Sequence, residues 1–382
     1  MLRSLTRRLG RTDWGVLIIA LALLLFGLVM VYSATFHLHM VGWIDVTGPA
    51  YYLVRQLRFA GLGLLALLCC WAIDYRYYRR LALPILVGTV AVLAVMALLG
   101  RWVQMVRGGE GGSVVLYGSI QPSEFAKMGA LIYIAIWLEA NVKQLHSFSM
   151  GTWPFTVLLG IMAGLIALQP DISTSVLLVA TATAVFFVAG AEMKHFVLLL
   201  LVGSLIILIP VLALGYGRER LDVWLAGPMS DPANAGYQMI QALQALSSGG
   251  FMGVGLGQSQ QKLYLGRVTH TDFIYSIIAE ELGFVGALAV IVLYGLWLWR
   301  GLQVARRAPD MYGRLLAVGI VSWVVFQAIL SVAVATDSVP VTGTVLPLIS
   351  YGGSSLVTTL ASVGILLNIS RAGPDAPRGN RP

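Results

Sequence analysis

The chain has 382 residues, of which 58% are hydrophobic and only 11% are charged. A water-soluble protein of this length needs more polar side chains to cover its surface, so the composition excludes a soluble domain. The formal net charge of +8 does not indicate nucleic-acid binding, because the cations are spread over many short segments without a continuous basic stripe. Cys69 and Cys70 are adjacent within an apolar segment and predict neither a disulfide framework nor a metal site.

Apolar segments long enough to cross the ~30 Å hydrocarbon core of a membrane as helices recur along the whole chain. They cover residues 14–35, 52–73, 81–100, 122–139, 153–169, 173–190, 196–215, 273–299, 314–336 and 353–370. The first follows a run of arginines, as a signal peptide does, but it is long and lacks a small-residue cleavage site. We therefore predict an all-α polytopic membrane protein of about ten transmembrane helices, with residues 1–382 forming one membrane domain.

The distribution of Lys and Arg predicts the orientation, because these residues are enriched in short cytoplasmic loops. With the N-terminus inside, most of the cations fall on the cytoplasmic side, including the arginines of the tail at 371–382, which we expect to be flexible. The opposite loops hold few cations. These are Arg101, Arg107, Arg218, Arg220, Lys262 and Arg267. We predict that both termini are cytoplasmic.

Three outward-facing segments differ from ordinary short connections. Residues 216–272, between the seventh and eighth predicted helices, form a large outer loop with an expected amphipathic helix at 237–246. A loop of this length is usually functional or disordered, and its aromatic content favours order. Residues 101–121 are rich in glycine. Residues 337–352 contain Pro340, Gly343 and Pro347, which break a helix, and non-helical backbone at membrane depth indicates a cavity.

Ionisable residues near the apolar segments are the first candidates for a functional site. Glu124 and Lys127 share one helical face, where the alternative role is a structural ion pair. Asp171 follows Pro170 and would equally serve as a helix N-cap. Asp272 directly precedes the eighth segment, and a simple N-cap is again the competing interpretation.

Two further groups of polar residues lead to weaker expectations. Glu280 and Glu281 lie deeper in the eighth segment, where adjacent carboxylates require partners and at least one should face the protein interior. His37 and His39 form a pair without a third ligand, which favours a surface position. The sequence has no Walker loop, serine-hydrolase elbow or zinc-protease motif.

Several strings, in their order and spacing, resemble the SEDS family (shape, elongation, division and sporulation), which includes RodA and FtsW. The strings are Asp13-Trp14, Gln121-Pro122-Ser123-Glu124, Gln169-Pro170-Asp171, Asp231-Pro232, His270-Thr271-Asp272-Phe273, Glu280-Glu281-Leu282-Gly283, Pro340-Val341-Thr342-Gly343 and Leu346-Pro347-Leu348-Ile349-Ser350-Tyr351. The resemblance covers nearly the whole chain, and 52–56 and 73–76 look slightly closer to FtsW. It implies a ten-helix peptidoglycan glycosyltransferase that polymerises lipid II into glycan strands at the outer face of the bacterial cytoplasmic membrane, for cell shape or division.

The resemblance also implies roles for particular residues. Asp272 matches the family's essential carboxylate and would act as the general base. Lys127 would contact the pyrophosphate leaving group, with Glu124 and Asp171 positioning Lys127 or a divalent cation, Mg²⁺ or Mn²⁺. Gln121, Thr271 and Ser350 belong to the same strings and would complete the substrate site.

The chain departs from the family pattern in two places. An Arg-Trp pair usually stands shortly before Gln121, but here Arg101 and Trp102 lie farther upstream. Ser173 replaces a glycine at a helix start.

The resemblance implies partners as well as an activity. They are lipid II, the nascent glycan strand, membrane lipid and a class B penicillin-binding protein that supplies transpeptidation. The alternative function is a flippase for the lipid-linked precursor. Against it, the chain shows no inverted repeat, and the charged candidates lie toward the outer face rather than the midplane.

Overall fold

The structure, a computed structural model, describes residues 12–39, 48–107, 121–169, 171–215 and 217–372. Over these residues the fold is helical and contains no strand. Ten long helices match the ten predicted segments: α2 (Trp14–Thr35), α3 (Tyr51–Ala72), α5 (Ala82–Arg107), α6 (Pro122–Asn141), α7 (Trp153–Ala167), α8 (Ile172–Val188), α9 (Met193–Leu214), α13 (Ile274–Arg306), α14 (Met311–Ala335) and α15 (Gly353–Arg371). The predicted all-α fold is confirmed.

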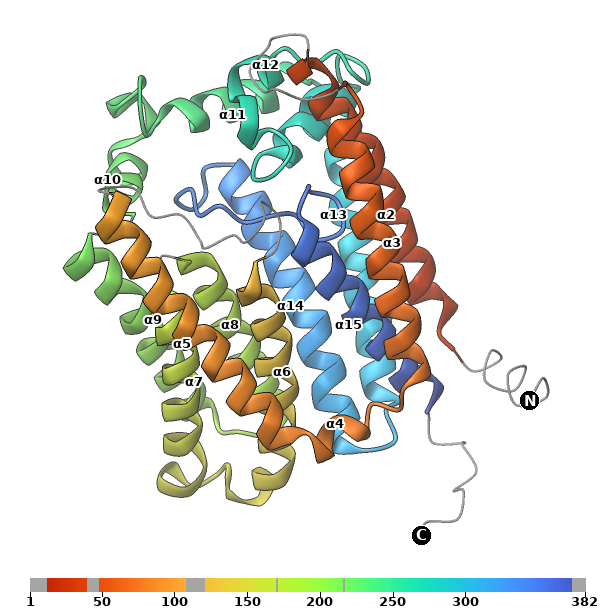
Figure 1. The fold of residues 1–382 in the computed structure, drawn as a ribbon, viewed down its shortest axis with the longest axis vertical. Helices are drawn as coiled ribbons and strands as arrows, with labels where there is room; N and C mark the ends of the chain where they lie inside the picture. Colours follow the sequence, from red (N-terminus) through yellow and green to blue (C-terminus); the bar gives the residue numbers. More distant parts are fainter. Residues whose placement is uncertain (1–11, 40–47, 108–120, 170, 216, 373–382) are drawn as a thin grey trace.

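The bundle is built to stand in lipid. Eight of the described helices are long and apolar enough to cross a membrane, and two shorter apolar helices, Ile172–Val188 and Met193–Leu205, lie between them. The outward faces carry large apolar side chains, such as Leu65 at 61% and Leu98 at 70% exposed. Burial concentrates in α14 and α15, which the other helices surround (Figure 1). The chain is therefore a polytopic membrane protein with its most buried helices at the centre.

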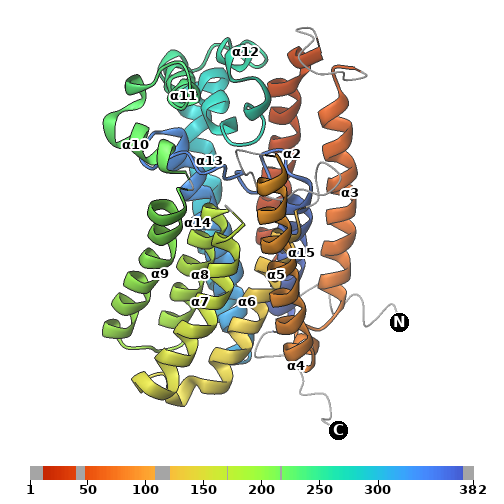
Figure 2. The same cartoon turned by 60° about the vertical axis from the view of Figure 1, so that its left-hand side comes forward.

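Short helices cover the two ends of the bundle (Figures 1 and 2). One end, called the capped end below, carries α10 (Arg218–Ala226), η4 (Pro228–Ser230), α11 (Tyr237–Ser248), α12 (Gln261–Leu265) and η5 (Gly266–Val268), all within the long segment between α9 and α13. The opposite end carries α4 (Tyr77–Arg80), η2 (Val142–Gln144) and η3 (Phe148–Thr152), and η1 (Phe36–His39) extends α2. Helix α11 confirms the predicted amphipathic helix, since its apolar side packs against α13.

The first described helix begins on the side of the bundle where the last one ends. The backbone N of Asp13 donates to Ser370 Oγ at 3.1 Å, next to the end that carries α4. This agrees with termini on one face of the membrane, and their cytoplasmic location stays a prediction. The tail at 373–382 and the glycines of 108–112 lie outside the described residues. Helix α5 continues to Arg107, so Arg101 and Trp102 are helical and not part of a loop.

Helix α13 is interrupted near the capped end, which hydropathy did not predict. Gly283 has φ 68°, and the backbone around it pairs with the 249–255 segment. Val254 N donates to Glu280 O at 3.0 Å, and Phe284 N donates to Gly250 O at 2.9 Å. A Cβ on Gly283 would lie 2.3 Å from Gly253 N, so only glycine fits this crossing. The break exchanges helix bonds for bonds to the loop.

The two adjacent glutamates near this break have the partners that the sequence requires. Glu281 forms a buried ion pair with Lys262 at 3.1 Å, and Glu280 Oε1 accepts from Gln260 N at 2.9 Å. Both anchor the segment that leads into α12. His37 is 5% exposed and its Nε2 lies 3.1 Å from Lys262 O. The predicted surface position is therefore wrong for His37, because the Lys262 segment covers it.

Candidate active site

The start of α6 places Gln121 against two other helices. Pro122 occupies the first turn, where its missing N–H costs no hydrogen bond. Gln121 Nε2 donates to Asp171 Oδ2 at 3.1 Å, and its backbone N donates to Ser354 Oγ at 2.9 Å at the start of α15. Gln121 therefore joins the beginnings of α6, α8 and α15 at the capped end of the bundle.

Asp171 is both a helix cap and a partner of Gln121. Its Oδ1 accepts the backbone N–H of Thr174 at 3.1 Å, so the N-cap interpretation is correct. The other oxygen accepts from Gln121. Beside it, Ser173 Oγ donates to Thr342 O at 2.7 Å. This bond ties α8 to the 336–352 segment, which is non-helical throughout, as predicted for 337–352.

Glu124 and Lys127 form the ion pair that the sequence suggested as their structural role. Lys127 Nζ lies 2.7 Å from Glu124 Oε1, and the side chains are 5% and 6% exposed. Lys127 Nζ also lies 5.2 Å from the ring centre of Trp323, a cation–π contact. Glu124 Oε2 is buried without a hydrogen-bond partner among the described residues. Direct contact between Lys127 and a substrate therefore requires this pair to open.

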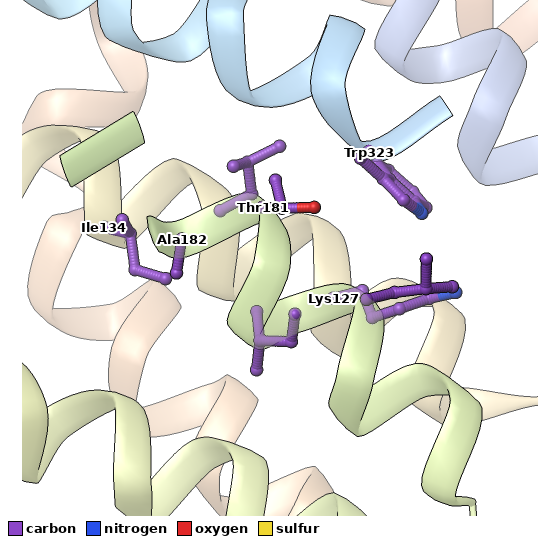
Figure 3. Close-up of a pocket in the computed structure, with 8 residues that line it drawn as sticks. Lys127, Ile134, Thr181, Ala182 and Trp323 are labelled. Atoms are coloured by element: carbon purple, nitrogen blue, oxygen red, sulfur yellow. The ribbon is translucent and has the colours of Figure 1, made fainter. Parts of the chain in front are cut away.

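Lys127 lines a pocket together with side chains of α6, α8 and α14 (Figure 3). Its wall is mainly apolar and includes Leu131, Ile134 and Leu177, with Trp323 facing Lys127 across it. Thr181 contributes a buried hydroxyl without a hydrogen-bond partner in the described structure. This lining does not suit a sugar, which needs several polar contacts.

Trp323 connects this region to the 336–352 segment. Its Nε1 donates to Gln327 Oε1 at 2.9 Å, and Gln327 Nε2 donates to Val345 O at 3.0 Å. Both side chains come from α14 and both are buried. The position of the segment is thus fixed from α14 as well as from α8.

Asp272 does not cap α13. Phe273 is the N-cap residue and makes no side-chain cap bond, so the N-cap interpretation of Asp272 is wrong. The carboxylate is partly buried beside Gly343, whose added Cβ would lie 3.7 Å from Asp272 Oδ2. Burial raises the pKa of Asp272 to about 6, while Arg220 and a hydrogen bond from Thr271 act in the opposite direction. A carboxylate with this pKa is suited to accept a proton near neutral pH.

Thr271 and Ser350 hold the two chain segments beside Asp272 together. Ser350 Oγ donates to Thr271 O at 2.7 Å and accepts from Leu346 N at 2.8 Å. From the other side, Gln56 Nε2 donates to Ser350 O at 3.2 Å. Ser350 is buried, so in this conformation its hydroxyl positions backbone and faces no open substrate site.

The predicted residues form two groups on either side of the 336–352 segment. Gln121 and Asp171 reach it through the bond from Ser173 to Thr342, and Asp272 lies against the next residue, Gly343. Sequence reasoning missed Gln56, Gln327 and Arg220. An amide within an apolar helix was an available signal for the first two.

The described residues do not build a metal cage. Over this part of the chain, no three His, Cys, Asp or Glu side chains lie together as metal ligands. Asp171 uses both oxygens in hydrogen bonds, and one oxygen of Glu124 pairs with Lys127. The protein donors alone therefore fit Mg²⁺ or Mn²⁺ poorly, although such ions are often held by one or two carboxylates together with substrate phosphates.

Comparisons with solved structures agree with this arrangement. A structure described as "Structural coordination of polymerization and crosslinking by a peptidoglycan synthase complex" contains a chain with a TM-score of 0.74 and 30% identity, covering 94% of this chain and 98% of that one. The rod shape determining protein RodA of Thermus thermophilus gives a TM-score of 0.66 at 28% identity, covering 94% and 97%.

Curated relatives match over nearly their full length. Stage V sporulation protein E of Bacillus subtilis is 39% identical, covering 96% of this chain and 99% of the relative. A probable peptidoglycan glycosyltransferase FtsW of Geobacter metallireducens is 36% identical, covering 95% and 96%. The family model for FtsW, RodA and SpoVE, described as cell cycle protein, matches residues 14–373. The chain therefore belongs to the FtsW, RodA and SpoVE family, the SEDS family that its motifs resemble.

Proposed function

We propose that this protein is a peptidoglycan glycosyltransferase of the bacterial cytoplasmic membrane, which polymerises lipid II into glycan strands at the outer face. The names of its relatives support this activity. The structural observation that carries it is Asp272, a partly buried carboxylate that caps no helix and whose pKa is raised to about 6. The segment before α13, the 336–352 segment and α10 meet at this carboxylate. It lies at one end of a bundle with an apolar outer surface.

The reaction joins two sugars through one displacement. A hydroxyl oxygen of the acceptor sugar attacks the anomeric carbon of the donor, and a C–O bond forms. The bond between that carbon and the diphosphate oxygen breaks, and its electron pair leaves with the lipid diphosphate. Asp272 takes the proton of the attacking hydroxyl, which makes the oxygen a better nucleophile.

Gln121, Asp171, Glu124 and Lys127 support the site from the α6 and α8 side. Asp171 and Gln121 hold the helix starts that contact the 336–352 segment through Ser173. Lys127 and Glu124 neutralise each other in a buried position, as two charges in a low dielectric must. These residues therefore position the segment beside Asp272, and Lys127 meets a diphosphate only if the pair opens.

The same proposal includes a partner and favours an enzyme over a carrier. The solved complex that resembles this chain is a peptidoglycan synthase complex, which supports association with a class B penicillin-binding protein. A flippase is less well supported, because Asp171 and Asp272 lie at helix starts at one end of the bundle and not at its middle.

Asp272→Asn tests the activity. We expect polymerisation of lipid II by the purified protein, alone and with the penicillin-binding partner, to fall by at least about 100-fold, the usual contribution of a general base. Asp222→Asn, an exposed carboxylate on α10, is the matched control and should leave the rate unchanged. A rate for Asp272→Asn near that of the control would remove Asp272 from the mechanism. Addition of a chelator in the same assay tests the need for a divalent cation.

A further inference from the structure

The leaving diphosphate needs a positive group that can reach it, and this requirement rests on the proposed function. Two lysines near the capped end are already neutralised. Lys127 is paired with Glu124. Lys262 is 2% exposed, paired with Glu281, and also donates to Gly257 O at 2.6 Å. Neither ammonium group is open to a substrate in this structure.

Arg220 differs from both lysines. It lies on α10, is exposed, and makes no ion pair with any carboxylate that the structure describes. Its Nη1 donates to Val341 O at 3.4 Å, a long bond that leaves most of the guanidinium free. Two residues earlier on the same helix, Arg218 faces Asp222 at 3.9 Å. Among the described residues, Arg220 is thus a cation of α10 that forms no direct ion pair.

Arg220 also lies beside the proposed base. Val341, which it contacts, is two residues from Gly343, which lies against the Asp272 carboxylate. Two residues of extended chain span at most about 7 Å. Arg220 and Asp272 therefore contact the 336–352 segment at neighbouring positions, so the base and the cation can act on opposite sides of one anomeric carbon. The guanidinium also lowers the pKa of Asp272 against the larger effect of burial, which agrees with this proximity.

The surface around Arg220 is a recess and not a flat face. Trp224, Pro228, Met239 and Asp337 line it together with Arg220 and Val341. Trp224 Nε1 donates to Asp337 O at 3.0 Å, which fixes α10 on the 336–352 segment. Asp337 is the acidic side chain of this lining, and burial raises the pKa of its carboxyl.

We propose that Arg220 binds the diphosphate of the lipid-linked donor and stabilises it as the leaving group. A guanidinium offers two parallel N–H donors to phosphate oxygens. It gives a positive charge at the bond that breaks, while Asp272 receives the proton at the bond that forms. Lys127 then helps to position the 336–352 segment from its buried site, through its contacts with Glu124 and Trp323.

Equilibrium binding of farnesyl diphosphate to the purified full-length protein in detergent tests the site directly. We expect Arg220→Gln to weaken binding by about ten-fold or more, the usual effect of losing a charged hydrogen bond. The affinity of Arg220→Lys should lie between those of the wild type and Arg220→Gln, because lysine keeps the charge and loses the paired donors. Arg218→Gln is the matched control on the same helix and should bind as the wild type does. Farnesol measures the contribution of the lipid chain alone.

The outcomes separate this site from the proposed function. Equal affinity of wild type and Arg220→Gln, or an equal loss in Arg218→Gln, would overturn the Arg220 site even if the protein polymerises lipid II. A ten-fold loss confined to Arg220→Gln supports the site even if polymerisation is absent, in which case the proposed function fails alone. Thermal unfolding of each variant verifies that binding is compared between folded proteins, and the exposure of Arg220 predicts unchanged midpoints.

Discussion

At the scale of single residues, the environment of Asp272 sets its chemistry. The carboxylate is removed from solvent without being used to cap α13, and burial raises its pKa to about 6. The groups that act on it are Arg220 from α10 and the Thr271 hydroxyl. His270, two residues earlier, is held neutral, because burial lowers its pKa to about 4. Arg220 is therefore the positive neighbour that adjusts the pKa of Asp272.

This environment predicts how the rate depends on pH. A general base works in its deprotonated form, so the rate should be constant well above pH 6 and fall about ten-fold per unit below the pKa. Removal of the Arg220 charge leaves only the Thr271 hydrogen bond acting against burial, so the pKa of Asp272 rises and Arg220→Gln should move the fall in rate to higher pH. Initial rates at saturating lipid II, measured from about pH 4.5 to about pH 8, cover both the constant region and the fall in rate. A fall in rate that moves to lower pH in Arg220→Gln would contradict this electrostatic account.

At the scale of elements, α14 links the buried ion pair to the segment beside Asp272. The Trp323 ring lies over Lys127, its Nε1 donates to Gln327, and Gln327 donates to Val345 O. Each contact fixes the next, because all of these groups are buried or partly buried. A shift of α14 would therefore move the ion pair and the segment together.

Gln327→Leu should break this link. Val345 O loses its donor, which costs about 1–3 kcal/mol when the oxygen stays buried. We expect kcat to fall about ten-fold or more with little change in the binding of farnesyl diphosphate, because Arg220 is untouched. Ser331→Ala is the control, since Ser331 is buried one turn along α14 and its hydroxyl has no partner in the described structure. Trp323→Phe added to Gln327→Leu should cost less than the sum of the two changes, and strict additivity would argue against the link.

The sequence predicted helices well and their interruptions poorly. Hydropathy located all ten long helices because lipid requires a continuous apolar surface about 20 residues long. It did not reveal the break at Gly283, because hydropathy averages over a window of residues. The 249–255 segment that bonds the opened backbone lies outside α13, so no pattern within α13 indicates the break. It also placed His37 on the surface, since the segment that covers it begins more than 200 residues later.

The candidate site was predictable in residue type and less so in role. Glu124, Lys127, Asp171 and Asp272 stand out because ionisable groups are rare near apolar segments. Their environments decide between catalysis and structure, and these depend on contacts between distant segments. Arg220 carried no such signal, because one arginine in an outer loop resembles any other until its neighbours are known.

At the scale of the whole molecule, the bundle is asymmetric along its long axis. One end carries α10, α11 and α12 over the candidate site, and the other carries α4, η2 and η3 with the exposed cations Arg79, Lys143 and Lys194 (Figures 1 and 2). An enzyme that uses a substrate already displayed outside must present its site there. The distribution of cations predicts that the other end is cytoplasmic, so the proposed function and the predicted orientation depend on each other.

Single cysteines in a Cys69→Ser, Cys70→Ser background test this orientation. Ser247 lies in the last turn of α11 and Gln144 ends η2, and both side chains are exposed. We expect Ser247→Cys to react with a membrane-impermeant maleimide in intact cells or spheroplasts, and Gln144→Cys to react only after the membrane is permeabilised. Neither change alters charge, so the positive residues that set the topology stay in place. Labelling of Gln144→Cys alone in intact cells would place Asp272 on the cytoplasmic side, where a polymerase of exported lipid II has no substrate.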